Sequence, residues 1–243
     1  MIWFIIATLV AFFIKGLCGF ANTLIFNGIL SYTANNINIS PLEVVLGYPS
    51  NIILVWKERK SLNWKIWLPL TALVVAGSIP GIFLLKHTDA GLLKVVFCIA
   101  VIIICIEMLF RGMKSSKSSN KKSGGSKIVL VLTGIISGLL CGLYGVGALL
   151  AAYVSRVAEN SHEFKANICV VFVVENTIRI ILYAATGILT LAVLKQVVIL
   201  IPFMLAAVFL GMKSSSVLNE KVIKKIVIVL LILSGIVLII NNL

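Results

Sequence analysis

The amino-acid sequence predicts an all-α polytopic membrane protein made of two inverted repeats, each with a glycine-tipped re-entrant helix and three transmembrane helices. Three observations lead to this expectation. Of the 243 residues, 60% are hydrophobic and only 12% are charged, which is too apolar for a soluble domain. The chain also contains eight long apolar segments, and a spanning helix needs about 20 apolar residues. Finally, most of the Lys and Arg residues lie in short loops beside these segments.

The first half of the chain, residues 1–111, begins with an apolar segment, 2–31, that is too long for one straight span. Its glycine-rich middle leaves an arm of about 14 residues, or roughly 20 Å of helix. The segment could be a long broken span or a re-entrant hairpin, whose irregular backbone must be satisfied by protein or by a watery cavity. It lacks the positive start and the cleavage site of a signal peptide, so we expect it in the mature protein. The expected spans of this half are 42–56, 65–85 and 91–110.

A basic linker rich in Ser and Gly, residues 112–127, separates the two halves. The second half, 128–243, again begins with a glycine-interrupted apolar segment, 128–154, with a first arm of about 10 residues or roughly 15 Å. The expected spans that follow are 165–186, 193–211 and 222–240.

The two halves resemble each other at three places that occur in the same order. The matched pairs are GLCGF at 16–20 with GLYGV at 142–146, Asn51 with Asn176, and Pro69 with Pro202. Aligning Cys18 with Cys141 instead would shift the register by three residues. The common order of the matches favours an internal duplication.

The positions of Lys and Arg distinguish spanning from re-entrant first segments. If all eight segments cross the membrane, the linker side carries 11 of these residues and the opposite side 8. If both first segments are re-entrant, the split becomes 16 to 3, with Lys15 and Arg179 inside the membrane. The positive-inside rule favours the second arrangement. Three crossings per half would invert the second repeat, and in the cell (inner) membrane the linker would be cytoplasmic with both termini outside.

The two glycine-rich tips are candidate anion-binding sites. The second arm of a broken helix begins with unpaired N–H groups and a positive dipole end, and glycine lets a ligand approach the backbone. The alternative is that these glycines only allow close packing of helices. The candidate residues at the tips are Gly16, Gly19, Asn22, Gly142, Gly145 and Gly147.

Ionisable and amide side chains near the tips complete the candidate site. Lys15 would lie deep in the membrane, where it could attract an anion, snorkel or pair with a carboxylate. Glu175 and Arg179 share a helix face and are expected to pair, either as a structural pair or with Arg179 facing the substrate. Asn51 and Asn176 occupy matching places in the halves, and their amides could bind an oxyanion or bridge helices.

Other functional classes find little support in the sequence. The five cysteines have no CxxC spacing, so neither a disulfide framework nor a metal site is expected. His87 and His162 fall in loops without an HExxH or GxSxG motif, and no Walker A or cofactor motif is present, so no enzyme and no cofactor are predicted. The net charge of +13 follows membrane orientation, so no nucleic-acid partner is expected.

Over nearly its whole length the chain resembles the sulfite exporter TauE/SafE family, also called the four-toluene sulfonate uptake family. The resemblance rests on a GxxG motif near the start of each half, on NIILVWKERKSLNW and ENTIRIILYAATGILT, and on the final stretch from PFMLAAVFLG onwards. Where the family tends to have a run of glycines after GxxG, this chain has Ala21 and Asn22 in the first half, and Gly147 followed by Ala148 in the second.

The resemblance implies transport of a small sulfur-containing anion, such as sulfite or sulfoacetate, across a bacterial inner membrane. Without a nucleotide-binding motif, the expected mechanism is secondary transport, with a proton or sodium ion as the possible coupling ion. The alternatives are a passive anion channel, a permease for another small anion, or a subunit without flux of its own. The expected partners are the anionic substrate and the lipid bilayer, and a homo-oligomer is an open alternative to a single copy of the chain.

Overall fold

The computed structural model describes residues 1–30, 36–87, 127–145, 147–215 and 217. The regular elements in these residues are all helices, which confirms the expected all-α class. The first half contains α1 (Ile2–Cys18), α2 (Asn22–Leu30), α3 (Asn36–Glu58), the short 3-10 helix η1 (Arg59–Ser61) and α4 (Trp64–His87). The second half contains α6 (Lys127–Tyr144), α7 (Ala148–Val157), α8 (Ser161–Ala185) and α9 (Leu191–Ser215). The expected spans 91–110 and 222–240, and the linker up to residue 126, lie outside the described residues.

Two breaks interrupt the long apolar segments that open the halves. The first break, residues 19–21, separates α1 from α2, and the second break, around Gly145 and Gly147, separates α6 from α7. α3 begins earlier than the expected span 42–56, so Ser40 also belongs to the helix, in which Glu43 lies two turns from the start.

Four described segments are long and apolar enough to cross a membrane, judged by length and composition. They are Ile39–Ser61, Trp64–Phe83, Ser161–Ala185 and Leu191–Ser215, while α1 is apolar but shorter. Large apolar side chains such as Ile181 and Val198 are more than half exposed on these helices. Such apolar exteriors suit contact with lipid.

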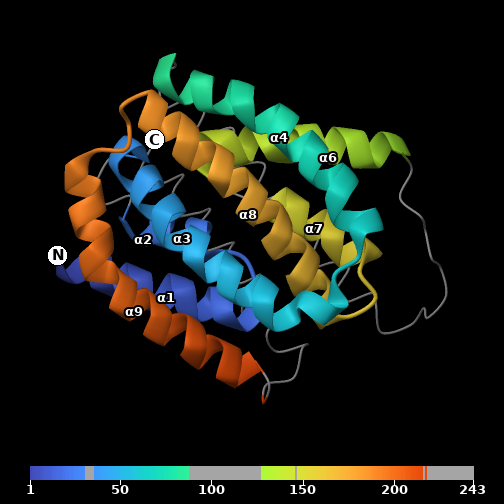
Figure 1. Cartoon of the computed structure of the whole chain (residues 1–243), viewed down its shortest axis with the longest axis horizontal. Helices are drawn as coiled ribbons and strands as arrows, with labels where there is room; N and C mark the ends of the chain where they lie inside the picture. The colour runs from blue at the N-terminus through green and yellow to red at the C-terminus, as the bar shows by residue number, and fades with distance from the viewer. Residues whose placement is uncertain (31–35, 88–126, 146, 216, 218–243) are drawn as a thin grey trace.

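The long helices α3, α4, α8 and α9 follow one common direction, and α1 and α6 cross them obliquely (Figure 1). The most extensive packing joins α4 with α6, α1 with α9, and α3 with α8. Glycines allow the first two of these contacts. A Cβ on Gly16 would lie 2.4 Å from the carbonyl oxygen of Val208 in α9, and one on Gly142 would lie 2.3 Å from that of Ser78 in α4. A side chain at either position would therefore push two helices apart.

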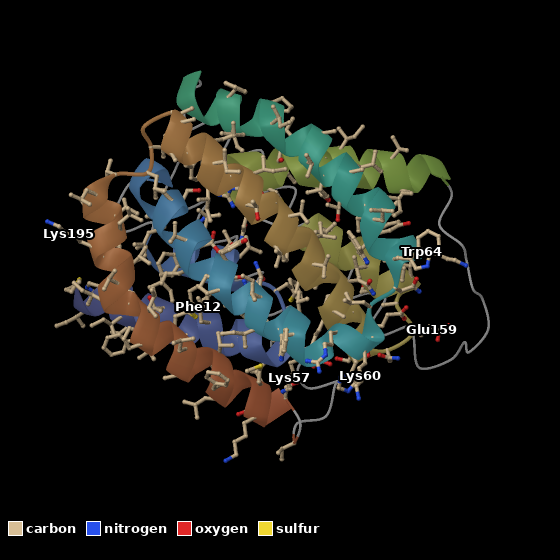
Figure 2. All side chains as sticks on the ribbon, in the orientation of Figure 1. Phe12, Lys57, Lys60, Trp64, Glu159 and Lys195 are labelled. Carbon is tan, nitrogen blue, oxygen red and sulfur yellow. The ribbon has the colours of Figure 1, made fainter. Side chains whose placement is uncertain are left out.

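One end of the bundle gathers the end of α3, the start of α4 and the start of α8. Nδ1 of His162 lies 2.7 Å from a carboxylate oxygen of Glu58, and the backbone N–H of Asn63 donates to Oδ1 of Asn167 at 3.0 Å. In Figure 2 the labelled residues Lys57, Lys60, Trp64 and Glu159 lie at this end, and Lys195 lies at the opposite end. We call the first the basic end of the bundle.

Candidate functional site

The first break is a tight left-handed turn between α1 and α2. Gly19 has φ 86°, and its N–H donates to the carbonyl oxygen of Lys15 at 2.6 Å, which closes the last turn of α1. Ala21 also has a positive φ, 74°. A left-handed conformation costs a non-glycine residue about 1–2 kcal/mol, so the break carries backbone strain at Ala21.

The second break repeats this local geometry. Gly145 has φ 71°, and its N–H donates to the carbonyl oxygen of Cys141 at 2.7 Å. The shared turn aligns Lys15 with Cys141 and Gly19 with Gly145, which is the 126-residue offset of the GxxG motifs. It does not align Cys18 with Cys141.

The two breaks contact α8 at different levels. A Cβ on Gly19 would lie 3.0 Å from the side chain of Lys165, and the Cys169 thiol donates to the carbonyl oxygen of Gly19 at 3.3 Å. A Cβ on Gly145 would lie 2.6 Å from Nη1 of Arg179. Lys165 and Arg179 are separated by about 21 Å of helix. The turns at Gly19 and Gly145 therefore contact α8 at different levels. The start of α2 nevertheless reaches the second break, because a Cβ on Gly145 would lie 2.9 Å from Cγ2 of Thr23.

A buried carboxylate lies at the start of α2, just after the first break. Oε1 of Glu43 in α3 accepts hydrogen bonds from Nδ2 of Asn22 and, at 2.7 Å, from the hydroxyl of Thr23. Glu43 is 2% exposed, and the cations Arg179 and Lys15 both interact with it electrostatically. Glu43 therefore sits among the groups that were expected to receive an anionic ligand.

Arg179 occupies the other side of this cluster, against the second break. Its Nη2 donates to the hydroxyls of Ser40 at 2.8 Å and Tyr183 at 3.1 Å, and these two oxygens are 3.0 Å apart. Its Nε lies 3.6 Å from Oε1 of Glu175, which is an ion pair without a hydrogen bond. Both atoms lack a hydrogen-bond partner within the described part of the chain. The guanidinium thus keeps an unused donor although it is 1% exposed.

Lys15 reaches the same region from α1. It is 1% exposed, and its Nζ donates to the carbonyl oxygen of Gly47 at 3.5 Å and lies 5.8 Å from the centre of the Phe12 ring. A Cβ on Gly47 would lie 3.3 Å from Oε1 of Glu43 and about as close to the amides of Asn22 and Asn176. Four helices, α1, α2, α3 and α8, therefore bring polar groups together around Gly47.

Asn51 lies one helical turn beyond Gly47 on α3, and its side-chain amide is buried without hydrogen bonds. The residue is 1% exposed, and neither Oδ1 nor Nδ2 finds a hydrogen-bond partner among the residues the structure describes. Leaving buried donors and acceptors unpaired costs about 1–3 kcal/mol per group, so such an amide is suited to a ligand or a water.

The structure brings together most of the residues singled out in the sequence. Lys15, Asn22, Gly145, Asn176, Glu175 and Arg179 surround the α3 and α8 interface. Gly16 and Gly142 lie elsewhere, in contacts between helix backbones. A Cβ on Gly147 would lie 2.3 Å from the ring of Phe172.

Glu43, Ser40, Thr23 and Tyr183 were not identified from the sequence. Glu43 stood at the edge of the expected span 42–56, where a charge is usual. A signal was present, because Glu43, Gly47 and Asn51 repeat every four residues and so share one helix face. Glu175, Arg179 and Tyr183 are likewise four residues apart and share one face of α8.

The helices and the site together define an integral membrane protein with a charged, polar interior. Ionisable groups in such positions are typical of transport proteins. The sequence model of the sulfite exporter TauE/SafE family matches residues 4–238, so the chain belongs to this family. It is accordingly a multi-pass membrane transport protein of a family that handles sulfur anions. The searches found no match among curated proteins or solved structures.

Proposed function

We propose that this chain is a secondary transporter that carries a small sulfur-containing anion, such as sulfite or sulfoacetate, across the cell membrane. The observation that carries the proposal is the fully buried Arg179, which packs on Gly145 and retains an unpaired Nε. A buried guanidinium with a spare donor is suited to an oxyanion, because charge-assisted hydrogen bonds to such groups are strong.

The anion path would follow the interface of α3 and α8. Polar groups occur along it from Ser40 and Tyr183, through Glu43, Gly47 and Asn176, to Asn51. Lys15 and Arg179 would offset the charge of the ligand. The expected binding residues at the breaks are Gly19, Asn22, Gly145 and Gly147, whereas the close backbone contacts at Gly16 and Gly142 favour packing at those two positions.

We further propose the inverted-repeat arrangement with two re-entrant segments. Suppose that the helices of the two halves correspond in order, α1 to α6, α2 to α7, α3 to α8 and α4 to α9. The packing of α1 on α9 then corresponds to the packing of α6 on α4, and the packing of α3 on α8 corresponds to itself. Such reciprocal pairing is expected of two repeats related by a twofold axis.

The basic end of the bundle also favours re-entrant segments. Glu58 and Asn63 follow α3, whereas His162 and Asn167 open α8, and these groups are in contact. If every apolar segment crossed the membrane, these two regions would lie on opposite sides. Only the segments between residues 63 and 162 decide this, so the contact supports a segment 128–154 that returns to the side on which it enters. For the segment 2–31, the re-entrant arrangement is proposed from the distribution of Lys and Arg and from the likeness of the two halves.

The test of function is a binding screen followed by flux measurement with the purified protein. Sulfite, thiosulfate, sulfoacetate, taurine and chloride are titrated against the protein, and the ligands that bind are loaded into proteoliposomes. We expect a sulfur oxyanion to bind in preference to chloride, and external substrate to accelerate the release of internal substrate. A flux whose rate changes neither with substrate on the opposite side nor with a counter-ion gradient would indicate a passive channel. Absence of binding and flux for every sulfur anion would contradict the proposal.

A further inference from the structure

Among the described helices, the candidate site buries equal numbers of positively and negatively charged side chains. Lys15 and Arg179 are cations, Glu43 and Glu175 are carboxylates, and each is at most 2% exposed. The groups act on one another electrostatically: Arg179 and Lys15 act on Glu43, and Glu43 acts on Glu175. Glu43 also interacts electrostatically with the thiol of Cys141 in α6. An added anion would therefore leave an uncompensated negative charge in a poorly solvated site.

The two carboxylates are held differently. Glu175 lies against Arg179 as its counter-ion on the same helix face, at 3.6 Å. Glu43 is held by neutral donors, the amide of Asn22 and the hydroxyl of Thr23, at the start of α2. These donors directly follow the first break. An anion that binds there must share donors with Glu43, and two like charges in one buried site disfavour each other.

We propose that Glu43 is the proton-carrying residue of the transporter, so that each substrate anion moves together with one proton. This inference rests on the proposed function and assigns its coupling ion. As the anion enters, a carboxylate oxygen of Glu43 takes a proton from water on that side of the membrane and forms an O–H bond. The neutral carboxyl group no longer repels the anion. When the anion leaves on the other side, Glu43 releases the proton to water there and again accepts from Asn22 and Thr23.

The sign of the pH dependence follows from this cycle. Because binding takes up a proton, affinity rises as pH falls and is lost as pH rises. With one linked proton, the dissociation constant changes about tenfold per pH unit over the range in which Glu43 titrates. Thiosulfate is the suitable probe, since unlike sulfite it does not change its own protonation near neutral pH.

Glu43→Gln and Glu175→Gln form the decisive pair of variants. Gln at position 43 has the length of Glu, can still accept from Asn22 and Thr23, and imitates the protonated state. We expect its dissociation constant for thiosulfate to be independent of pH and close to the acidic limit of the wild type. In proteoliposomes, a pH gradient should drive accumulation by the wild type and fail to do so for Glu43→Gln. Glu175→Gln should keep a pH-dependent dissociation constant, and Glu58→Gln, at the far end of α3, should keep it too.

Calorimetry on the wild type in buffers of different ionisation enthalpy gives a measure that needs no variant. We expect one proton to be taken up for each thiosulfate bound. Thiosulfate binding without proton uptake would overturn the coupling role and leave the proposed function intact. A pH dependence that persists in Glu43→Gln and disappears in Glu175→Gln would overturn the assignment to Glu43. Failure of the wild type to bind or move any sulfur anion would instead overturn the proposed function itself.

Discussion

Arg179 combines complete burial with incomplete hydrogen bonding, and this combination separates a structural role from a binding role. Its Nη2 donates hydrogen bonds to the hydroxyls of Ser40 and Tyr183, whereas its Nε lies 3.6 Å from Oε1 of Glu175 and donates no hydrogen bond to it. A purely structural pair would be expected to close to hydrogen-bond distance, because unpaired buried donors are costly. The open contact fits a guanidinium that is shared between a protein carboxylate and a ligand.

We expect Arg179→Gln to weaken thiosulfate binding by on the order of tenfold to a hundredfold, since a charge-assisted hydrogen bond contributes about 1.5–3 kcal/mol. The variant should also lose stability, because Glu175 is left without its counter-ion. The double variant Arg179→Gln with Glu175→Gln should regain part of the stability and none of the affinity. Titration and thermal unfolding of both single variants and the double variant check this. Recovery of both properties in the double variant would make the pair purely structural.

Whether a ligand approaches the backbone at Gly145 can be tested with Gly187 as a control inside the same chain. A Cβ there would lie 2.6 Å from Nη1 of Arg179 at a positive φ of 71°. Gly187 has a similar φ of 74°, yet nothing lies within 4 Å of the position of its Cβ. Gly145→Ala and Gly187→Ala should therefore share a backbone penalty of about 1–2 kcal/mol. Only Gly145→Ala should reduce thiosulfate binding and flux. Equal binding by the two variants would remove Gly145 from the site.

At the scale of helices, the sequence predicted the class of fold and the positions of the breaks. Apolar length identified the long helices, and GxxG located both turns, because few residues other than glycine adopt a positive φ. The partners of the charges were not predictable. Asn22 and Glu43 are 21 residues apart, and their contact depends on how α2 folds back onto α3. Single-sequence periodicity carries no information on such a tertiary approach.

The GxxG motifs also show two roles that sequence alone could not separate. The second glycine of each motif forms the turn, whereas the first, Gly16 or Gly142, contacts the backbone of another helix. We expect Gly16→Ala and Gly142→Ala each to lower stability by about 1–3 kcal/mol through overpacking. The fraction of protein that folds should bind thiosulfate with ordinary affinity. Thermal unfolding and titration of the folded fraction measure both effects. Ordinary stability with lost binding would move these glycines into the binding site.

For the whole molecule, the central question is which segments share a side of the membrane. In Figure 2, Lys60 and Glu159 lie at the basic end and Lys195 at the other. The contacts of Glu58 with His162 and of Asn63 with Asn167 join the same two regions. Under the re-entrant arrangement the positive-inside rule makes the basic end cytoplasmic.

Single-cysteine labelling in intact cells tests this arrangement. Lys60→Cys, Glu159→Cys and Lys195→Cys are placed separately in a background without the native cysteines, and a membrane-impermeant maleimide is added before or after permeabilisation. We expect Lys195→Cys to react in intact cells, and Lys60→Cys and Glu159→Cys to react only after permeabilisation. Eight full crossings would put residues 60 and 195 on one side and 159 on the other, because the segment 128–154 would then carry the chain across the membrane. Labelling of Glu159→Cys in intact cells, with Lys60→Cys protected, would therefore rule out the re-entrant second segment and with it the inverted repeat.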